Sequence, residues 1–325
     1  MKVSGRISVL VLVVFLTVSL CCGEAWGVFD AARAVYHQRK GLSYHNKGQW
    51  DEAITEYNKA IELSPNYVDA YYNRGLTYGT KRQYDQAISD FSKVIELKPA
   101  IAPKLISAYY NRGSLYLYKR QYDQVISDCS KAIELDPRFA DAHVNRGIAY
   151  RNKSQHDQAI SDFDKAIEIN PRLAEAYVNR GLAYLDKSQY ELAITNSTKA
   201  IELNPRFAKA YNNRGLAYLG NRQYELAISD STKAIEINPS YAEAYYNRGS
   251  AYVYKRQYEL AISDFSKATE INPSYAKAYS NRAATYYFKG EYDKAWEDVH
   301  KAESLGFLVP HGLLKLLREA SNRER

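Results

Sequence analysis

The sequence predicts an all-α solenoid, a superhelix of stacked helix pairs, because two residue types recur at one fixed interval. Glycine forms the series Gly41, Gly75, Gly113, Gly147, Gly181, Gly215 and Gly249. Proline forms the parallel series Pro65, Pro99, Pro137, Pro171, Pro205, Pro239 and Pro273. Both series advance in steps of 34 residues, with one step of 38. Since glycine frees the backbone and proline restrains it, the shared interval indicates a structural repeat.

Residues 242–275 show how one repeat forms a helix pair. The first helix is expected over residues 242–254 and the second over residues 258–271, ending before Pro273. Gly249 lies on an aromatic stripe of the first helix, where its missing Cβ lets the second helix approach closely. A single helix pair cannot bury both of its faces, whereas stacked helix pairs share a continuous core.

An interval of about 34 residues, with this order of aromatic, glycine, alanine and proline positions, resembles the tetratricopeptide repeat. The resemblance covers the eight segments 34–67, 68–101, 106–139, 140–173, 174–207, 208–241, 242–275 and 276–309. It implies helix–turn–helix units whose inner face binds extended peptides. A four-residue insertion, 102–105, separates the second and third repeats. Since four residues make about one helical turn, we expect the first helix of repeat 3 to begin one turn early.

One departure from the family pattern concerns charge. An arginine stands where the family prefers leucine, directly before the glycine or, in repeat 8, before Ala283, at Arg74, Arg112, Arg146, Arg180, Arg214, Arg248 and Arg282. An aspartate recurs at a matching place in the second helix, at Asp90, Asp128, Asp162, Asp230, Asp264 and Asp298. We therefore expect Arg–Asp pairs between the two helices of a repeat or between neighbouring repeats.

A second departure is that the aromatic position of the second helix weakens in the middle of the array. Successive repeats hold Tyr57, Phe91, Cys129, Phe163, Ser197, Ser231, Phe265 and Val299 there. A buried ring contributes about 2–3 kcal/mol more than a serine. We therefore expect repeats 5 and 6 to be less stable than the others. Cys129 is expected to be a small buried core residue.

Both ends of the array carry further segments. Residues 26–33 lead into repeat 1, and Asp30 is expected to cap the N-terminus of its first helix. Residues 310–325 are expected to form an amphipathic capping helix and a short tail. We expect this helix to cover the open face of repeat 8 rather than to bind a membrane surface.

Residues 1–25 differ from the rest of the chain and are interpreted as a secretory signal peptide. Lys2 and Arg6 precede or border the uncharged apolar run 7–22, and small residues follow it. The array is therefore expected to be exported, to the periplasm or cell envelope or into the medium. Two alternatives stay open: the run 7–22 remains as a membrane anchor, or a cysteine at its end is lipid-modified as in a bacterial lipoprotein.

No pattern in the sequence supports an enzyme, a cofactor or a metal site. The six histidines share no ligand spacing, and the sequence has neither a phosphate-binding glycine loop nor a serine nucleophile motif. The formal net charge of +7 is mild for 325 residues, so a nucleic-acid partner is not expected. Cations gather at the ends of the first helices, as in Lys81-Arg82 and Lys255-Arg256, where they favour the helix dipole.

A second stripe of each first helix carries the candidate binding residues. Its recurring asparagines are Asn73, Asn111, Asn145, Asn179, Asn213, Asn247 and Asn281. Its variable aromatic positions include Tyr72, Tyr110, Tyr118, Tyr246 and Tyr254. In the family that this chain resembles, the stripe lines a groove, where amides can bond a peptide backbone whatever its side chains. The alternative is that each asparagine bridges to the backbone of the neighbouring repeat. The lysine–asparagine pattern that holds carboxylate tails in chaperone-binding members is absent.

The sequence therefore predicts a non-catalytic protein–protein interaction scaffold that binds an extended peptide or a partner protein in a concave groove. The alternative is a structural or assembly component of a cell-envelope complex, which associates through the edge or the ends of the solenoid. Membrane association is expected only through the N-terminal segment.

Overall fold

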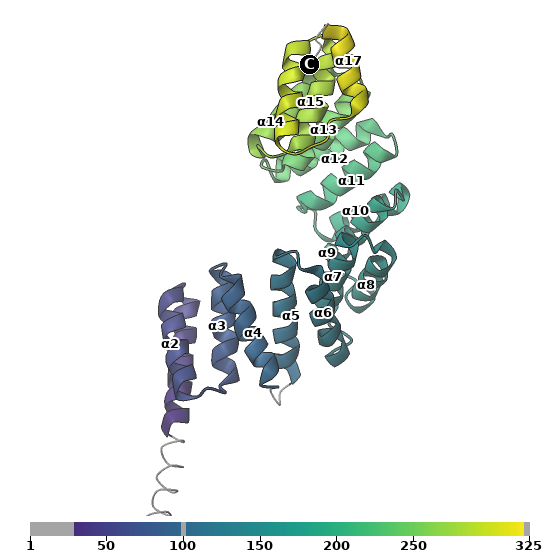
Figure 1. Cartoon of the computed structure of the whole chain (residues 1–325). Coiled ribbons are helices and arrows are strands. Elements are labelled where there is room, and N and C mark those ends of the chain that lie inside the picture. The colour runs from purple at the N-terminus through teal and green to yellow at the C-terminus, as the bar shows by residue number, and fades with distance from the viewer. Residues whose placement is uncertain (1–28, 99–101, 322–325) are drawn as a thin grey trace, which may run out of the picture. The chain divides into compact units, whose positions relative to one another are not determined.

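The computed structural model describes residues 29–98 and 102–321, and every regular element within them is an α-helix (Figure 1). The predicted signal peptide, with its two alternatives, lies outside the described residues. By its contacts the chain divides into two compact units, Met1–Ala149 and Tyr150–Arg325. The all-α prediction is confirmed.

Helices alternate with short loops in both units. In the first unit a helix at 29–46 precedes α2 (Trp50–Leu63), α3 (Val68–Thr80), α4 (Tyr84–Glu96), α5 (Ala102–Tyr118) and α6 (Tyr122–Leu135), and α7 (Ala140–Asn152) spans the boundary. The second unit continues with α8 (His156–Ile169), α9 (Ala174–Asp186), α10 (Tyr190–Leu203), α11 (Ala208–Gly220), α12 (Tyr224–Ile237), α13 (Ala242–Tyr254), α14 (Tyr258–Ile271), α15 (Ala276–Lys289), α16 (Tyr292–Ser304) and α17 (His311–Ser321). The helix at 29–46 and the odd-numbered helices α3 to α15 are called A helices, and the even-numbered helices are called B helices.

The helix boundaries confirm the predicted repeat unit. Helices α13 and α14 begin and end at the residues predicted for repeat 7. Helix α5 begins at Ala102, one turn before its repeat starts, as the insertion predicted. The prediction of a helix cap at Asp30 is wrong, because residue 29 is already helical. Asp30 instead pairs with Arg33 at 3.3 Å, one turn along the same helix.

Small residues let the two helices of a repeat pack closely. A Cβ atom at Gly249 would lie 2.9 Å from the Phe265 ring, closer than carbon atoms normally approach. Cys129 takes the place of the ring in repeat 3 and is fully buried, as predicted. The A helices therefore turn their glycine side toward their own B helix, and the opposite stripe is left for other contacts.

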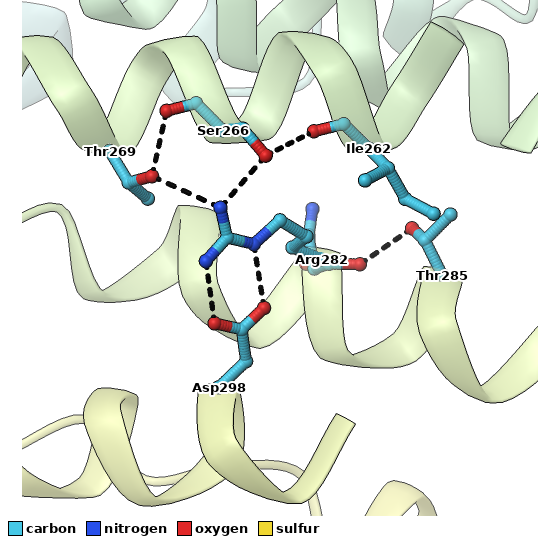
Figure 2. Close-up of polar contacts among 7 residues, drawn as sticks. Ile262, Ser266, Thr269, Arg282, Thr285 and Asp298 are labelled. Atoms are coloured by element: carbon cyan, nitrogen blue, oxygen red, sulfur yellow. Dashed lines mark hydrogen bonds and ion pairs between the residues drawn. The ribbon is translucent and has the colours of Figure 1, made fainter. Parts of the chain in front are cut away.

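In repeats 2, 3 and 5 to 8 the arginine of this series joins three helices, an arrangement that we call the arginine bridge. Figure 2 shows it for Arg282 of α15, whose Nε and Nη2 each donate to the Asp298 carboxylate of α16 at 2.7 Å. Its Nη1 donates to Ser266 Oγ at 2.8 Å, on the B helix of the preceding repeat. Burial raises the pKa of Asp298, and the bonds from Arg282 oppose that rise.

The bridge recurs in both units and confirms the predicted Arg–Asp pairs. The other bidentate pairs are Arg74–Asp90, Arg112–Asp128, Arg214–Asp230 and Arg248–Asp264. Their third partners, on the preceding B helix, are Asn58, Ser92, Thr198 and Thr232. Arg180 differs, because its Nε donates to the amide oxygen of Asn196 at 2.8 Å and its Nη1 pairs with Asp164.

Repeat 1 replaces the arginine bridge with a cluster around Glu56. His37 Nδ1 lies 2.6 Å from one carboxylate oxygen, and Lys40 and Lys59 donate to the other at 3.2 and 2.9 Å. Burial opposes ionisation of Glu56, but these three hydrogen bonds prevail and lower its pKa to about 2.

The serines of repeats 5 and 6 are fully buried where other repeats hold a ring. Neither Ser197 Oγ nor Ser231 Oγ has a hydrogen-bond partner among the described residues. An unsatisfied buried hydroxyl adds its own desolvation cost to the loss of apolar contact. The lower stability of repeats 5 and 6 stays a prediction. The unpaired hydroxyls are a second reason to expect it, in addition to the missing rings.

Helix α17 packs on the last repeat, as expected of a capping helix. Leu317 is fully buried in one cluster with Val299 of α16, and Trp296 Nε1 donates to Ser321 Oγ at 3.1 Å. Among the described residues, no helix combines the length and apolar character needed to cross a membrane.

Replacing Arg248 with alanine is expected to destabilise repeat 7 by about 3 kcal/mol, because Asp264 would stay buried without its partner. Asp264→Asn is expected to cost about 1 kcal/mol, since Arg180 already bonds an asparagine in repeat 5. Hydrogen exchange of the α13 and α14 amides measures both changes. Lys267→Ala serves as the control, because its pair with Glu270 is exposed. Equal losses in the arginine and lysine variants would contradict the role of the bridge.

Ser231→Ala is expected to stabilise repeat 6 by about 1 kcal/mol, because it removes a buried hydroxyl that has no partner. Slower amide exchange in α12 would show the gain. Ser229→Ala, on the exposed side of the same helix, controls for the change in helix propensity. If both substitutions had the same effect, burial of the hydroxyl would not be the cause of weakness in this repeat.

The cluster around Glu56 is expected to make repeat 1 acid-sensitive. Because the pKa of Glu56 is lowered, its ion pairs contribute fully to the stability of repeat 1 above about pH 4.5. This contribution is lost as the pH falls toward about 2. The free energy of opening of α2, obtained from its amide exchange across this pH window, should fall by about 3 kcal/mol in the native chain. The Glu56→Gln variant should lack this component, and an unchanged pH profile in that variant would refute the assignment.

Candidate functional site

Two adjoining clefts run along the A helices of the second unit. The larger, of about 840 Å³, is lined by α9, α11 and α13, with contributions from α10, α12 and α15. The smaller, of about 650 Å³, is lined by α13, α14 and α15. The two share Ser250, Tyr254 and Asn281, so they form one surface, which we call the A-helix groove.

The stripe predicted to carry binding residues lines this groove. Tyr246, Asn247 and Tyr254 face the larger cleft together with Leu216 and Leu219. The first unit has a separate cleft of about 530 Å³ on the same side of its A helices, where Asn111 and Tyr118 are found. That these residues bind a ligand stays a prediction, but their place on a hollowed surface agrees with it.

Four of the seven asparagines also tie neighbouring A helices together. Asn111 Nδ2 donates to the Tyr72 hydroxyl at 3.1 Å, and Asn281 Nδ2 donates to the Tyr246 hydroxyl at 3.0 Å. Asn247 donates to Asn212 Oδ1 at 2.9 Å, and Asn145 donates to Ser114 Oγ at 2.9 Å. The partner is thus a side chain of the preceding A helix, not the backbone that the alternative named. In the A-helix groove, the amides of Asn247 and Asn281 therefore hold neighbouring A helices together.

The remaining asparagines lack such a bond. Asn213 follows a repeat that holds Val178 at the partner position, and valine offers no acceptor. The amide nitrogens of Asn213 and Asn179 are buried with no partner among the described residues, although Asn179 Oδ1 accepts from Lys209 at 3.3 Å. Asn73, in α3, is partly buried. The asparagine series is therefore not one uniform ladder.

The predicted aromatic residues divide into two kinds. Tyr72, Tyr110 and Tyr246 pack into the array: Tyr246 lies 5.1 Å from the Tyr275 ring, and burial raises its pKa. Tyr110 lies 4.8 Å from the Phe139 ring. Tyr118 and Tyr254 instead stand at the ends of their A helices with 73% and 64% of their surface exposed. These two are the tyrosines that a ligand can reach most readily.

Each exposed ring stacks on an aromatic residue that begins the preceding B helix. Tyr254 lies parallel to Tyr224, with ring centroids 4.9 Å apart and planes 6° apart. Tyr118 stacks on Tyr84 at 5.5 Å, and Phe288 stacks on Tyr258 at 5.6 Å. Such offset pairs are stabilising, and they hold the outer rings rigidly at the groove.

Sequence reasoning missed the rings that begin the B helices and the loop residue two positions before them. That loop residue has a positive φ in both units: Arg82, Arg222 and Arg256 lie at 58°, 59° and 57°. Gly48 and Gly290 take the same place in the first and last repeats. The signal was present, because glycine at an aligned loop position indicates a left-handed conformation there.

Among residues 29–98 and 102–321, no group of three or more His, Cys, Asp or Glu side chains could hold a metal ion. The A-helix groove is lined by rings, amides, leucines and loop arginines, together with smaller side chains such as Ser250 and one acidic side chain, Asp186.

Comparison with protein families gives matches along most of the array. A model described as the tetratricopeptide repeat matches residues 68–100, 106–139, 140–173, 208–241 and 242–275. Two related models match residues 41–82 and 181–221, and residues 163–195 and 265–297. An uncharacterized protein of Methanocaldococcus jannaschii is 45% identical over 42 residues, which is 13% of this chain and 49% of that protein.

Solved structures share the fold. The APC/C hetero-tetramer Cut9–Hcn1 aligns with a TM-score of 0.66 at 18% identity, covering 86% of this chain and 54% of that one. A tetratricopeptide repeat protein from Parabacteroides merdae aligns with a TM-score of 0.63 at 20% identity, covering 74% and 94%. The chain thus spans about half the length of the archaeal relative and of the Cut9–Hcn1 chain.

The matched segments, the 34-residue helix pairs and the structural likeness agree. Proteins built from this repeat are typically non-catalytic scaffolds for protein–protein interaction. The chain belongs to the tetratricopeptide-repeat family.

Proposed function

We propose that the chain holds an extended segment of a partner protein in its A-helix groove. The observation that carries this proposal is the groove itself, in which exposed rings stand beside leucines and amides. Tyr254 and Phe288 expose 64% and 55% of their surface although each is held by a stacked partner. Rigid tyrosines provide contact area with little loss of side-chain entropy on binding.

The groove also has the proportions of a peptide site. Its two clefts of about 840 and 650 Å³ join along α13 and α15, so the surface is longer than a single side-chain pocket. An extended chain needs an elongated surface with alternating apolar and polar contacts. Chemistry on the bound segment is not part of the proposal, since the groove carries no clustered acid–base residues. Export through residues 1–25 would place this binding outside the cytoplasm.

A second candidate is assembly through an end of the array. The A helix at 29–46 exposes 69% of Phe29 and 60% of Tyr36, which lie two turns apart on one helix face. At the position of Tyr36, later repeats hold a fully buried alanine, such as Ala70 and Ala108. These two rings favour an end-to-end or envelope-tethering contact if the groove proves inactive.

Selection from a random peptide display library on the full-length chain tests the proposal. Peptides bound in the groove should lose at least about tenfold in affinity in a Tyr254→Ala, Phe288→Ala variant, because both exposed rings are removed. The matched variant Phe29→Ser, Tyr36→Ser, which alters the exposed end, should bind as the native chain does. Peptides that respond only to the end variant, or a selection that enriches nothing, would refute groove binding and favour assembly.

A further inference from the structure

Four arginines lie in left-handed loops, and three of them, Arg82, Arg222 and Arg256, line the clefts described above, whereas Arg120 is not among the residues that line these clefts. Arg82, Arg222 and Arg256 are exposed, and none of their guanidinium groups forms an ion pair within the described part of the chain. Their backbone conformation costs a residue with a Cβ about 1 kcal/mol or more, and Gly48 and Gly290 show that glycine fits the same loop. Strained residues without a packing role mark candidate functional positions.

Arg82 and Arg256 each follow a lysine that behaves differently, whereas Arg222 follows Asn221. Lys81 pairs with Asp51, and Lys255 pairs with Glu225, in each case on the B helix of the preceding repeat. Lys289 makes the equivalent contact with Glu259 at 3.2 Å. The lysines are therefore neutralised by acids and contribute to stacking of the repeats. By contrast, Arg82, Arg222 and Arg256 form no ion pair among the described residues, so their charges are uncompensated.

Each of these arginines lies in a cleft beside a stacked aromatic pair. Arg222 lines the larger cleft of the A-helix groove, next to Tyr224 and Tyr254. Arg256 lines the smaller cleft, next to Tyr258 and Phe288.

The first unit repeats the arrangement independently. Its cleft of about 530 Å³ is lined by Arg82 together with the stacked rings of Tyr84 and Tyr118. Three clefts thus contain the same set of a loop arginine and two parallel rings.

The charge of the A-helix groove is positive. Asp186 is the one acidic side chain among the described residues that line the two clefts, and Arg151 already donates to its carboxylate at 2.6 Å. Arg222 and Arg256 are one repeat apart on the same groove. Neighbouring packed helices lie about 8–10 Å apart, a distance that an extended chain covers in about three residues.

We infer that the A-helix groove selects an acidic extended protein segment, in which carboxylates about three residues apart pair with Arg222 and Arg256. The inference rests on the proposed function and names the chemistry of its ligand. Guanidinium groups suit carboxylates because they donate two parallel hydrogen bonds. The leucines and rings between the arginines suit apolar side chains between the acids, which a protein segment has and a nucleic-acid backbone lacks.

The test uses two fluorescein-labelled peptides, four copies of Glu-Leu-Ser and four copies of Gln-Leu-Ser, and fluorescence anisotropy with the full-length chain. The glutamate peptide is expected to bind at least about tenfold more tightly than the glutamine peptide at low salt, and the difference should shrink at high salt. The variant Arg222→Gly, Arg256→Gly should lose this preference. Its melting temperature should be unchanged or higher, because glycine relieves the backbone strain, so a loss of binding could not be attributed to unfolding.

The variant Lys233→Gln, Lys267→Gln is the charge-matched control. It also removes two positive charges, but from α12 and α14, where each lysine pairs with the glutamate three residues later. This variant should keep the full preference for the glutamate peptide. Equal losses in both variants would show a general charge effect and overturn the inference.

Other outcomes also decide the question. If the glutamate peptide does not bind, or binds no better than the glutamine peptide, the inference fails. A single-stranded oligonucleotide that displaces the glutamate peptide and shows the same dependence on the two arginines at lower concentration would reassign the site to nucleic acid. If library selection yields groove-binding peptides without acids that ignore the arginine variant, the proposed function stands and this inference falls.

Discussion

The arginine bridge is the interaction on which the rest of the structure depends. One guanidinium group binds a carboxylate of its own repeat and a hydroxyl or amide of the preceding B helix, as Arg282 does with Asp298 and Ser266. Three helices are thereby fixed by one side chain, whose planar fork suits two-point recognition of a carboxylate. Because the bridge uses the B-helix side of each A helix, the opposite stripe remains for the groove.

A second set of contacts works on the groove side. The amide of Asn247 reaches Asn212, and that of Asn281 reaches the Tyr246 hydroxyl, so successive A helices are joined at the floor of the clefts. The same residues were expected to meet a ligand. Their bonds make them primarily organisers of the surface, whereas the exposed rings and loop arginines project from it. The proposed recognition and the stacking of the repeats therefore use different side chains.

Much of the fold follows from the sequence because its signals are local and repeated. Glycine and proline recur in seven of the eight repeats, so the ends of α13 and α14 could be predicted to the residue. The joint recurrence of arginine and aspartate predicted their pairs. The site was harder to predict. Whether Asn213 finds an acceptor depends on Val178 one repeat earlier, and the stack of Tyr224 on Tyr254 joins residues from different repeats. Arg82 and Arg256 were attributed to the helix dipole, because the sequence does not distinguish them from the lysines that precede them.

The short reach of the arginine bridge has an evolutionary consequence. Each arginine contacts its own repeat and the one before it, and its third partner can be Asn58, Ser92 or Thr198 without change of geometry. Unequal crossing-over between the coding segments of such repeats would therefore leave each arginine with a hydroxyl or amide partner on the preceding B helix. The gene can therefore lengthen or shorten the array by whole repeats, while repeat 1 and helix α17 remain at its two ends.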